Sequence, residues 1–309
     1  MGKKGEFNFN WDDIEEKQGK LDDVKSSGGA NDDPRFYKVK TDSEGRFLAT
    51  VRFLPPPQGE SVARVPYYSH YFSGVDNSWY VEACPKTIGK KCPVCDHTYE
   101  IYTEYGKEGA RKRNAGKYQK KAWISNILVL EDKQNPENEG KVFLYKYGVT
   151  VKDILDDARK PEDPDQDPIN PYDFTNGADF RLAVYQKETP EGKFPQYDKC
   201  KFKSQSELYD GDYDKLSEMY GNCESLEEFV KEESYEEYEV LKKKLFKTIG
   251  KDYEDVNTEL DDFTKKEEKS EKETPKQTPK DEPKKEEKKV ELNEVEDEDD
   301  FFKSLRDDD

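Results

Sequence analysis

The segment that organises this chain reads His70-Tyr71-Phe72, Trp79-Tyr80-Val81-Glu82-Ala83-Cys84 and Lys91-Cys92-Pro93-Val94-Cys95. It contains three of the five cysteines and one of the two histidines. Cys92 and Cys95 form a C-x-x-C pair, a spacing that lets two thiolates reach one ion from a tight turn. Cys84 and His70 complete a Cys₃His set, which is typical of structural zinc because it leaves no position open for a catalytic water.

Two alternatives remain open at this motif. A C-x-x-C pair is also typical of redox-active or buried free thiols, but a redox pair prefers the start of a helix in a βαβ unit. The flanking residues here are instead aromatic and Lys-rich. The nitrogen ligand is also open, since His97 lies two residues beyond Cys95 and competes with His70. We favour His70, because it lies in a hairpin pattern, whereas the short reach from Cys95 to His97 makes a strained chelate.

The composition indicates a folded centre with polar ends. The 309 residues include 71 acids and 52 bases, for a net charge of −19, and only 32% of the residues are apolar. Part of such a chain cannot pack a core, yet 16 Phe and 20 Tyr do not fit a wholly disordered protein. No apolar run approaches the roughly 18 residues that cross a bilayer, and the first residues do not read as a secretory signal. With an odd number of cysteines, these patterns favour a cytoplasmic location.

Three regions follow from the distribution of these residues. Residues 1–33 read as a flexible N-terminal arm, although Phe7, Phe9 and Trp11 keep a docking role open. Residues 34–255 read as the folded core, with the zinc subdomain at about 65–110. Residues 256–309 read as a disordered acidic tail, in which 291–309 hold 10 acids against two bases. Within the tail, the candidate partner-binding groups are Phe301, Phe302 and Leu305.

The hydrophobic periodicity predicts a mostly β core with helices that cover it on the C-terminal side. Alternation or short apolar runs predict strands at 47–54, 65–72, 79–83, 122–130, 141–149, 180–186 and 194–202. Capping-box patterns and a 3.6-residue period predict helices at about 150–159, 226–230 and 238–249. The aromatic segment 99–105 is open to a helical interpretation, and 107–121 reads as a basic loop.

This basic segment is the electrostatic exception in an acidic protein. Residues 107–121 carry seven bases against Glu108, a net charge of +6. Cationic groups follow phosphates, and aromatic faces stack unpaired bases at about 1–3 kcal/mol each, which suits a single strand better than a duplex. A solvated loop beside core aromatics is the competing interpretation, and the neighbouring zinc motif favours nucleic acid. The cationic candidates are Lys107, Arg111, Lys112, Arg113, Lys117, Lys120 and Lys121, and the aromatic candidates are Tyr99, Tyr102, Tyr105, Tyr118, Trp123, Tyr145, Tyr147, Phe194 and Tyr197.

No motif of the chain predicts catalysis. A nucleophile elbow, a phosphate-cradling Gly-rich loop and an H-E-x-x-H helix are all absent from the sequence. Two histidines, one of them a candidate ligand, leave little for acid–base chemistry. We therefore predict a protein that is not an enzyme.

Four segments of the sequence, two of which belong to the cysteine motif above, resemble one known family. Trp79–Cys84, Cys92-Pro93-Val94-Cys95, Ser125-Asn126-Ile127-Leu128-Val129-Leu130 and Pro136-Glu137-Asn138-Glu139-Gly140-Lys141-Val142-Phe143 resemble the helix-destabilising single-stranded DNA-binding proteins of T-even-type bacteriophages. The similarity covers roughly residues 45–200. It implies an OB-fold-type barrel with a zinc-binding subdomain, and a role in phage DNA replication, recombination and repair inside the infected host.

The resemblance also implies roles for particular residues. The family's zinc ligands match His70, Cys84, Cys92 and Cys95. Its stacking aromatics match best at Trp123, Tyr145, Phe194 and Tyr197, with Lys146 as a basic neighbour, while its tyrosines match less closely at Tyr99, Tyr102 and Tyr105. Its basic loop corresponds to Arg111 through Lys121. Its tail implies that the acidic segment of this chain competes with DNA for the binding site and binds replication or recombination proteins.

The N-terminal arm departs from the family pattern. Only Lys3 and Lys4 precede Glu6, whereas the family carries a compact basic run that drives assembly along the strand. Two alternatives stay open: self-association along DNA is absent, or another contact, such as the aromatic patch of the arm, carries it. Two rival functions remain: an RNA-binding translational regulator with the same module, and a zinc-stapled scaffold whose basic segment binds an acidic protein.

Overall fold

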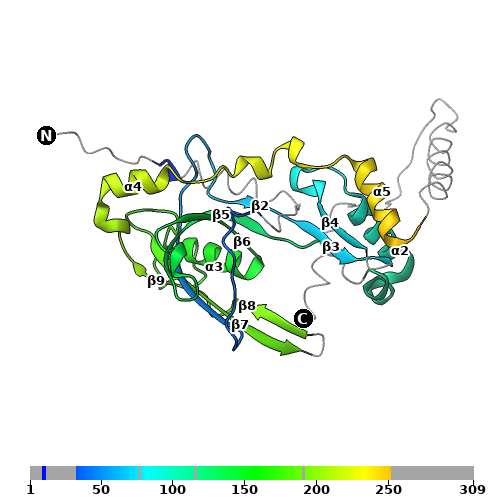
Figure 1. The fold of residues 1–309 in the computed structure, drawn as a ribbon, viewed down its shortest axis with the longest axis horizontal. Coiled ribbons are helices and arrows are strands. Elements are labelled where there is room, and N and C mark those ends of the chain that lie inside the picture. Colours follow the sequence, from blue (N-terminus) through cyan, green and yellow to red (C-terminus); the bar gives the residue numbers. More distant parts are fainter. Residues whose placement is uncertain (1–8, 12–32, 76–77, 115–116, 190–191, 252–309) are drawn as a thin grey trace, which may run out of the picture. The chain divides into compact units, whose positions relative to one another are not determined.

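The computed structural model describes residues 9–11, 33–75, 78–114, 117–189 and 192–251 (Figure 1). The predicted tail, 256–309, with Phe301, Phe302 and Leu305, lies outside the described residues. So does the predicted arm, apart from 9–11 and Asp33. Phe9 packs edge-on against Phe174 and Tyr220, so this part of the arm contacts the chain's own core.

One open antiparallel sheet forms the larger part of the fold. Its central strand, β1, pairs with β5 on one side and β7 on the other, while β2 and β6 add to β5, and β8 and β9 add to β7. Among the described strands no pairing joins β6 to β8 or β9, so the ladder does not close into a barrel. The protein is thus mostly β with helices, as predicted. The strands are β1 (Arg46–Phe53), β2 (Val65–Pro66), β5 (Trp123–Asp132), β6 (Val142–Tyr147), β7 (Ala178–Thr189), β8 (Gly192–Gln196) and β9 (Lys201–Gln205).

The strand β5 is buried on both of its faces, which explains its nearly unbroken apolar run. Ile127 and Val129 point into the main core. Ile124 and Leu128 point to the opposite face, where they belong to two smaller clusters. Because successive side chains of a strand alternate between faces, neighbouring residues of β5 enter different cores.

A second unit of secondary structure surrounds the cysteines. The hairpin of β3 (Ser69–Ser73) and β4 (Trp79–Ala83) leads through η2 (Pro85–Ile88) into α2 (Pro93–Arg113). Helix α5 (Tyr238–Ile249) covers this unit with Leu245, and Gly250 ends the helix in the left-handed conformation, as predicted. A Cβ atom at Gly74 would lie 2.0 Å from the carbonyl oxygen of Thr248, so glycine is required where the hairpin meets α5.

Three sequence predictions differ from this architecture. The predicted strand 65–72 is divided, because β2 pairs with β5 while β3 pairs with β4. The first half of the predicted basic loop is helical, because α2 continues to Arg113 across a kink at Gly106 (φ 65°), and the segment 99–105 is helical in line with the helical interpretation. The predicted strand 194–202 is two strands, β8 and β9, which pair with different parts of β7.

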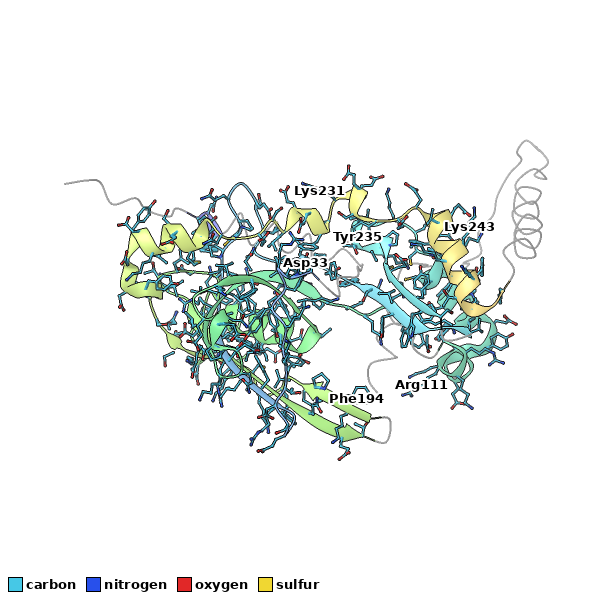
Figure 2. All side chains as sticks on the ribbon, in the orientation of Figure 1. Asp33, Arg111, Phe194, Lys231, Tyr235 and Lys243 are labelled. Carbon is cyan, nitrogen blue, oxygen red and sulfur yellow. The ribbon has the colours of Figure 1, made fainter. Side chains whose placement is uncertain are left out.

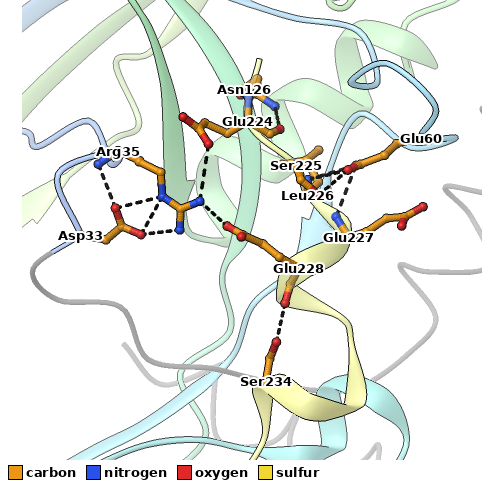
Figure 3. Close-up of polar contacts among 10 residues, drawn as sticks. All are labelled: Asp33, Arg35, Glu60, Asn126, Glu224, Ser225, Leu226, Glu227, Glu228 and Ser234. Carbon is orange, nitrogen blue, oxygen red and sulfur yellow. Dashed lines mark hydrogen bonds and ion pairs between the residues drawn. The ribbon is translucent and has the colours of Figure 1, made fainter. Parts of the chain in front are cut away.

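The segment after α4 forms no α-helix at 226–230, only the short turn η5 (Glu227–Phe229). Figure 3 shows the polar contacts that Glu60 and Asn126 make with this connection. The carboxylate of Glu60 accepts from the backbone N–H groups of Leu226 and Glu227, and Asn126 exchanges two hydrogen bonds with the backbone of Glu224. The remaining elements are η3 (Pro136–Asn138), α3 (Val149–Arg159), η4 (Leu208–Gly211), α4 (Tyr213–Tyr220) and η6 (Glu232–Ser234).

In the part of the chain that the structure describes, no helix combines the length and the apolar character that crossing a membrane requires.

Candidate metal centre and nucleic-acid interface

Four buried side chains converge between the β3–β4 hairpin and the start of α2. His70 comes from β3, Cys84 follows β4, Cys92 caps α2, and Cys95 lies in its first turn. Their ligand atoms all lie within 4.8 Å of one another. The Nε2 atom of His70 lies 3.4 Å from the Sγ atoms of both Cys92 and Cys95, and the Sγ atoms of Cys84 and Cys95 are 3.5 Å apart.

These distances fit a tetrahedral metal site. Around a zinc ion with ordinary bond lengths, two sulfurs stand about 3.8 Å apart, and a sulfur and a nitrogen about 3.6 Å apart. The three short separations given above are below these values by only a few tenths of an ångström, and every other pair of ligand atoms lies within 4.8 Å. The donor set, one imidazole and three thiolates, could therefore hold a metal and is consistent with zinc.

Two residues from the segment after α2, Lys117 and Gln119, contact the candidate ligands. The Nδ1 atom of His70 lies 2.9 Å from the carbonyl oxygen of Lys117. Because a carbonyl only accepts, Nδ1 carries the proton, and Nε2 is left to face the cysteines. The side-chain amide of Gln119 donates to the Sγ atoms of Cys84 (3.6 Å) and Cys95 (3.8 Å). N–H donors of this kind stabilise negative sulfur.

The electrostatics of the cluster favour one thiolate. Burial disfavours the charged form of Cys84, but hydrogen bonds with Cys92 and Cys95 and the nearby His70 outweigh burial, and the pKa of Cys84 falls well below its usual value. His97 is outside the cluster, and its Nδ1 lies 3.9 Å from Glu100. Burial, followed by nearby lysines, lowers the pKa of His97 to about 4. The structure thus brings His70, and not His97, to the cysteines.

The predicted interface residues of α2 extend from Tyr99 to its last residue, Arg113. Tyr99 and Tyr102 are half-buried, whereas Tyr105 is 43% exposed. The guanidinium carbon of Arg113 lies 3.8 Å from the centre of the Tyr105 ring, a cation–π contact. Arg111, Lys112 and Arg113 are exposed in the last turn, where cations also complement the helix dipole (Figure 2).

The rest of the basic segment runs alongside the metal centre. Lys120 is exposed and pairs through its backbone with Ser69 of β3, so this segment extends the sheet of the hairpin. Lys117, Tyr118 and Lys121 are half-buried. The Nζ atom of Lys121 lies 5.8 Å from the ring centre of Tyr68.

Trp123 and Tyr145 belong to the main core. They are only 4% and 2% exposed, so the structure offers neither of them as an open stacking platform. The reason is tertiary: both faces of β5 and β6 are covered. The Nε1 atom of Trp123 and the hydroxyl of Tyr145 are nevertheless buried without a hydrogen-bond partner among the described residues. Such orphaned donors need an explanation in a folded protein.

Lys146 does not share a face with Tyr145. It lies opposite Ile124 in the β5–β6 pair, and its Nζ atom is 4.6 Å from the ring centre of Tyr67, on the far side of the sheet from the main core. Burial lowers the pKa of Lys146 to about 8. The structure therefore does not bring Lys146 to Tyr145.

The remaining two aromatic candidates lie on or near the β7–β8 hairpin. Phe194 is 46% exposed on β8 and lies opposite Lys187 of β7 (Figure 2). Tyr197 follows the hairpin and is half-buried against the main core. Phe194 therefore has an exposed ring opposite a cation, whereas the ring of Tyr197 is partly covered by the main core.

Sequence reasoning missed two features of this region. Gln119 gave no signal, because its contacts with two thiolates depend on the path of the chain after α2. Tyr71 and Trp79 form an exposed stacked pair, with ring centres 4.8 Å apart. Tyr71 and Trp79 alternate along their strands with Phe72 and Tyr80, which face inward. This alternation could have indicated that Tyr71 and Trp79 share the outer face.

Comparison with known proteins assigns the chain to one family. Residues 45–249 match the model of the family described as gp32 DNA binding protein like. The chain is 31% identical over 234 residues to the single-stranded DNA-binding protein of Enterobacteria phage T2, and that alignment covers 72% of each chain. It is 30% identical over 235 residues to the protein of that name in Enterobacteria phage T4, with 73% of each chain covered. A protein of the same name in Escherichia phage SV14 is 32% identical over 85 residues, which are 26% of this chain and 74% of that one. The family match spans more than half of the chain, and the protein belongs to the gp32-like DNA-binding protein family.

Proposed function

We propose that this protein binds and coats single-stranded DNA, without catalysis, during phage DNA replication, recombination and repair. The observation that carries the proposal is the grouping of the exposed Tyr105 ring with Arg111, Lys112 and Arg113 at the end of α2. Exposed aromatic faces and cations together suit a strand whose bases are unpaired. The family match and the names of its relatives support the same activity.

The mechanism follows from the separate tasks of these side chains. The cations at the end of α2, with Lys120, follow the phosphates and release counterions on binding. Tyr105 and Phe194 stack bases. Trp123 and Tyr145 are buried in the main core and support the interface from beneath, without an open face for stacking. Because only the single strand is bound, duplexes melt passively as the protein traps open strands.

We further propose that His70, Cys84, Cys92 and Cys95 hold one structural zinc ion. When bound, the ion supplies a closed tetrahedral crosslink and no catalytic water. The chain's own residues prepare that crosslink, because Lys117 orients His70 and Gln119 donates to two sulfurs. Lys117 and Gln119 lie within the basic segment, next to Lys120, so the centre also fixes the part of the segment that carries Lys120.

The domain plan is part of the proposal. An arm at 1–33, a core at 34–255 with the zinc subdomain at about 65–110, and an acidic tail at 256–309 suit a protein that assembles on DNA. We propose that the core is of the OB type, that the tail competes with DNA and then binds replication proteins, and that the protein acts in the cytoplasm of the infected host. The resemblance of the sequence to the T-even-type proteins supports each of these.

A salt-dependent titration with polydeoxythymidylate tests the proposed function. We expect tyrosine and tryptophan fluorescence to fall on binding, with an affinity that decreases linearly in a log–log plot against salt. Competition with an RNA oligomer of the same sequence tests the alternative function, an RNA-binding translational regulator. Preference for the RNA, or absence of binding to either strand at low salt, would overturn the proposal.

A further inference from the structure

The outer face of the β3–β4 hairpin gathers exposed apolar side chains. Seven large apolar residues are well exposed in the described part of the chain, and four of them, Tyr71, Val75, Trp79 and Val81, belong to this hairpin or its turn. Scattered exposed apolar residues are ordinary, whereas a contiguous group marks a binding surface. The group is therefore a candidate site.

The pairing of the strands places three of these residues, Tyr71, Trp79 and Val81, on one face, whereas Val75 lies in the turn outside the paired residues. Tyr71 lies opposite Val81, and Ser73 lies opposite Trp79, while His70, Phe72 and Tyr80 point to the metal centre and α5. The rings of Tyr71 and Trp79 stack with their centres 4.8 Å apart and an interplanar angle of 28°. They remain 44% and 56% exposed. Two rings already aligned in this way form a rigid platform.

The charge on this face favours an anionic ligand. Lys120 lies opposite Ser69 in the antiparallel bridge, so its side chain leaves the sheet on the same side as Tyr71. Among residues 69–75 and 78–83, Glu82 is the one carboxylate. It points to the other face, where Lys244 lies 2.7 Å from its oxygen. A cation on the same face as a pair of rings, with Glu82 paired to Lys244 on the other face, has the chemistry of a base-stacking site.

The exposed aromatics of the molecule are consistent with this assignment. The described residues contain four well-exposed aromatic rings: Tyr105, Phe194, Tyr71 and Trp79. The first two belong to the proposed interface. Lys120 links the other two to it, because it belongs to the basic segment and also borders the hairpin face.

From this geometry we infer that Tyr71 and Trp79, with Lys120 beside them, form an additional stacking site for unpaired DNA bases. The inference rests on the proposed function and extends it by a site on the metal-binding unit. The ligand is one or two bases of the bound strand with their phosphates, and the platform has the sequence tolerance of any aromatic face.

The experiment compares Trp79→Leu, Trp79→Phe and the wild-type protein in titrations with oligodeoxythymidylate. Loss of one stacking ring should weaken binding by roughly fivefold to hundredfold in the Leu variant. The Phe variant keeps a ring and should retain most of the affinity. Val240→Leu, at an exposed apolar position of α5 outside the hairpin, serves as the matched control and should bind as the wild type does. Equal metal content and circular dichroism in all variants exclude unfolding.

The outcomes separate this inference from the proposed function. If wild-type protein binds the oligomer and Trp79→Leu binds equally well, the inference fails while the proposed function stands. If the wild type does not bind, the proposed function fails first. If Trp79→Leu changes sedimentation of the DNA-free protein but not its affinity for an oligomer that holds one copy, the face is a contact between copies and the inference is overturned. Photocrosslinking of bromodeoxyuridine oligomers to the peptide that contains Trp79 would support the inference directly.

Discussion

The imidazole Nδ1 of His70 donates to the carbonyl oxygen of Lys117 over 2.9 Å. This bond joins the candidate metal centre to the segment that carries the basic side chains. Gln119 adds contacts with two sulfurs of the same centre. Hydrogen bonds therefore connect the candidate metal centre directly to the proposed DNA interface. A substitution in one of them should alter the binding properties of the other.

One zinc ion per chain is the first expected outcome. Structural zinc supplies on the order of 10 kcal/mol of folding free energy in small modules, so Cys92→Ser should lower both zinc content and DNA affinity. Cys223→Ser, outside the cluster, is the matched control and should alter neither. Metal analysis of protein purified without chelators checks the claim. Less than half an equivalent of zinc would contradict it.

Gln119→Ala should weaken metal binding while the four ligands remain in place. Loss of a partner that orients or hydrogen-bonds the ligands commonly costs about 10-fold to 100-fold in metal affinity. Competition with a chromogenic chelator measures the change. Gln58→Ala, at an exposed position outside the centre, is the control. Equal metal affinity in the two variants would show that the N–H donors of Gln119 contribute nothing.

Phe194→Ala and Tyr145→Ala should have different consequences. Phe194 is exposed, so its loss should weaken binding to single strands by about 1–3 kcal/mol and leave the free energy of unfolding nearly unchanged. Tyr145 is buried in the main core, and truncation there should destabilise the fold by about 3–5 kcal/mol. Urea denaturation and DNA titration of each variant distinguish the two. A Phe194 variant with full affinity would remove that residue from the interface.

Lys120→Ala should change the salt dependence of binding. Each phosphate contact on a single strand contributes about 0.7 to the slope of log affinity against log salt, so the slope should fall by about that amount. Lys231→Ala, at an exposed position in the connection between α4 and α5, should leave the slope unchanged. Titrations at four or more salt concentrations provide the measurement. The same slope in both variants would argue against a phosphate contact at Lys120.

Deletion of residues 264–309 should tighten binding to single strands at low salt. The segment 291–309 has a net charge of −8, and a tethered anion competes with polyphosphate at an effective concentration that reaches millimolar. The gain should disappear at high salt, where screening removes the attraction. Affinity of full-length and truncated protein across salt concentrations checks this. If the two curves coincide at low salt, the tail only keeps the protein in solution.

Local pattern alone was enough for the three cysteines of the candidate metal centre and for most of the regular elements. The spacing of Cys84, Cys92 and Cys95 depends on a turn and a helix start that are short-range, so the set could be identified without any knowledge of packing. The period of Leu241, Leu245 and Phe246, ended by Gly250, likewise specified α5. In both cases the information lies within a few residues of chain.

Tertiary structure decided which aromatic side chains are available to a ligand. In the sequence, Trp123, Tyr145 and Phe194 were equivalent candidates for stacking. Both faces of β5 and β6 are covered, which buries Trp123 and Tyr145, whereas Phe194 on β8 is exposed. The choice of His70 over His97 and the contacts of Gln119 also depend on chain paths that meet from distant positions. Exposure and long-range contacts depend on which surfaces of the folded chain cover one another. The pattern of residues along the sequence predicts only the type and the buried face of each element.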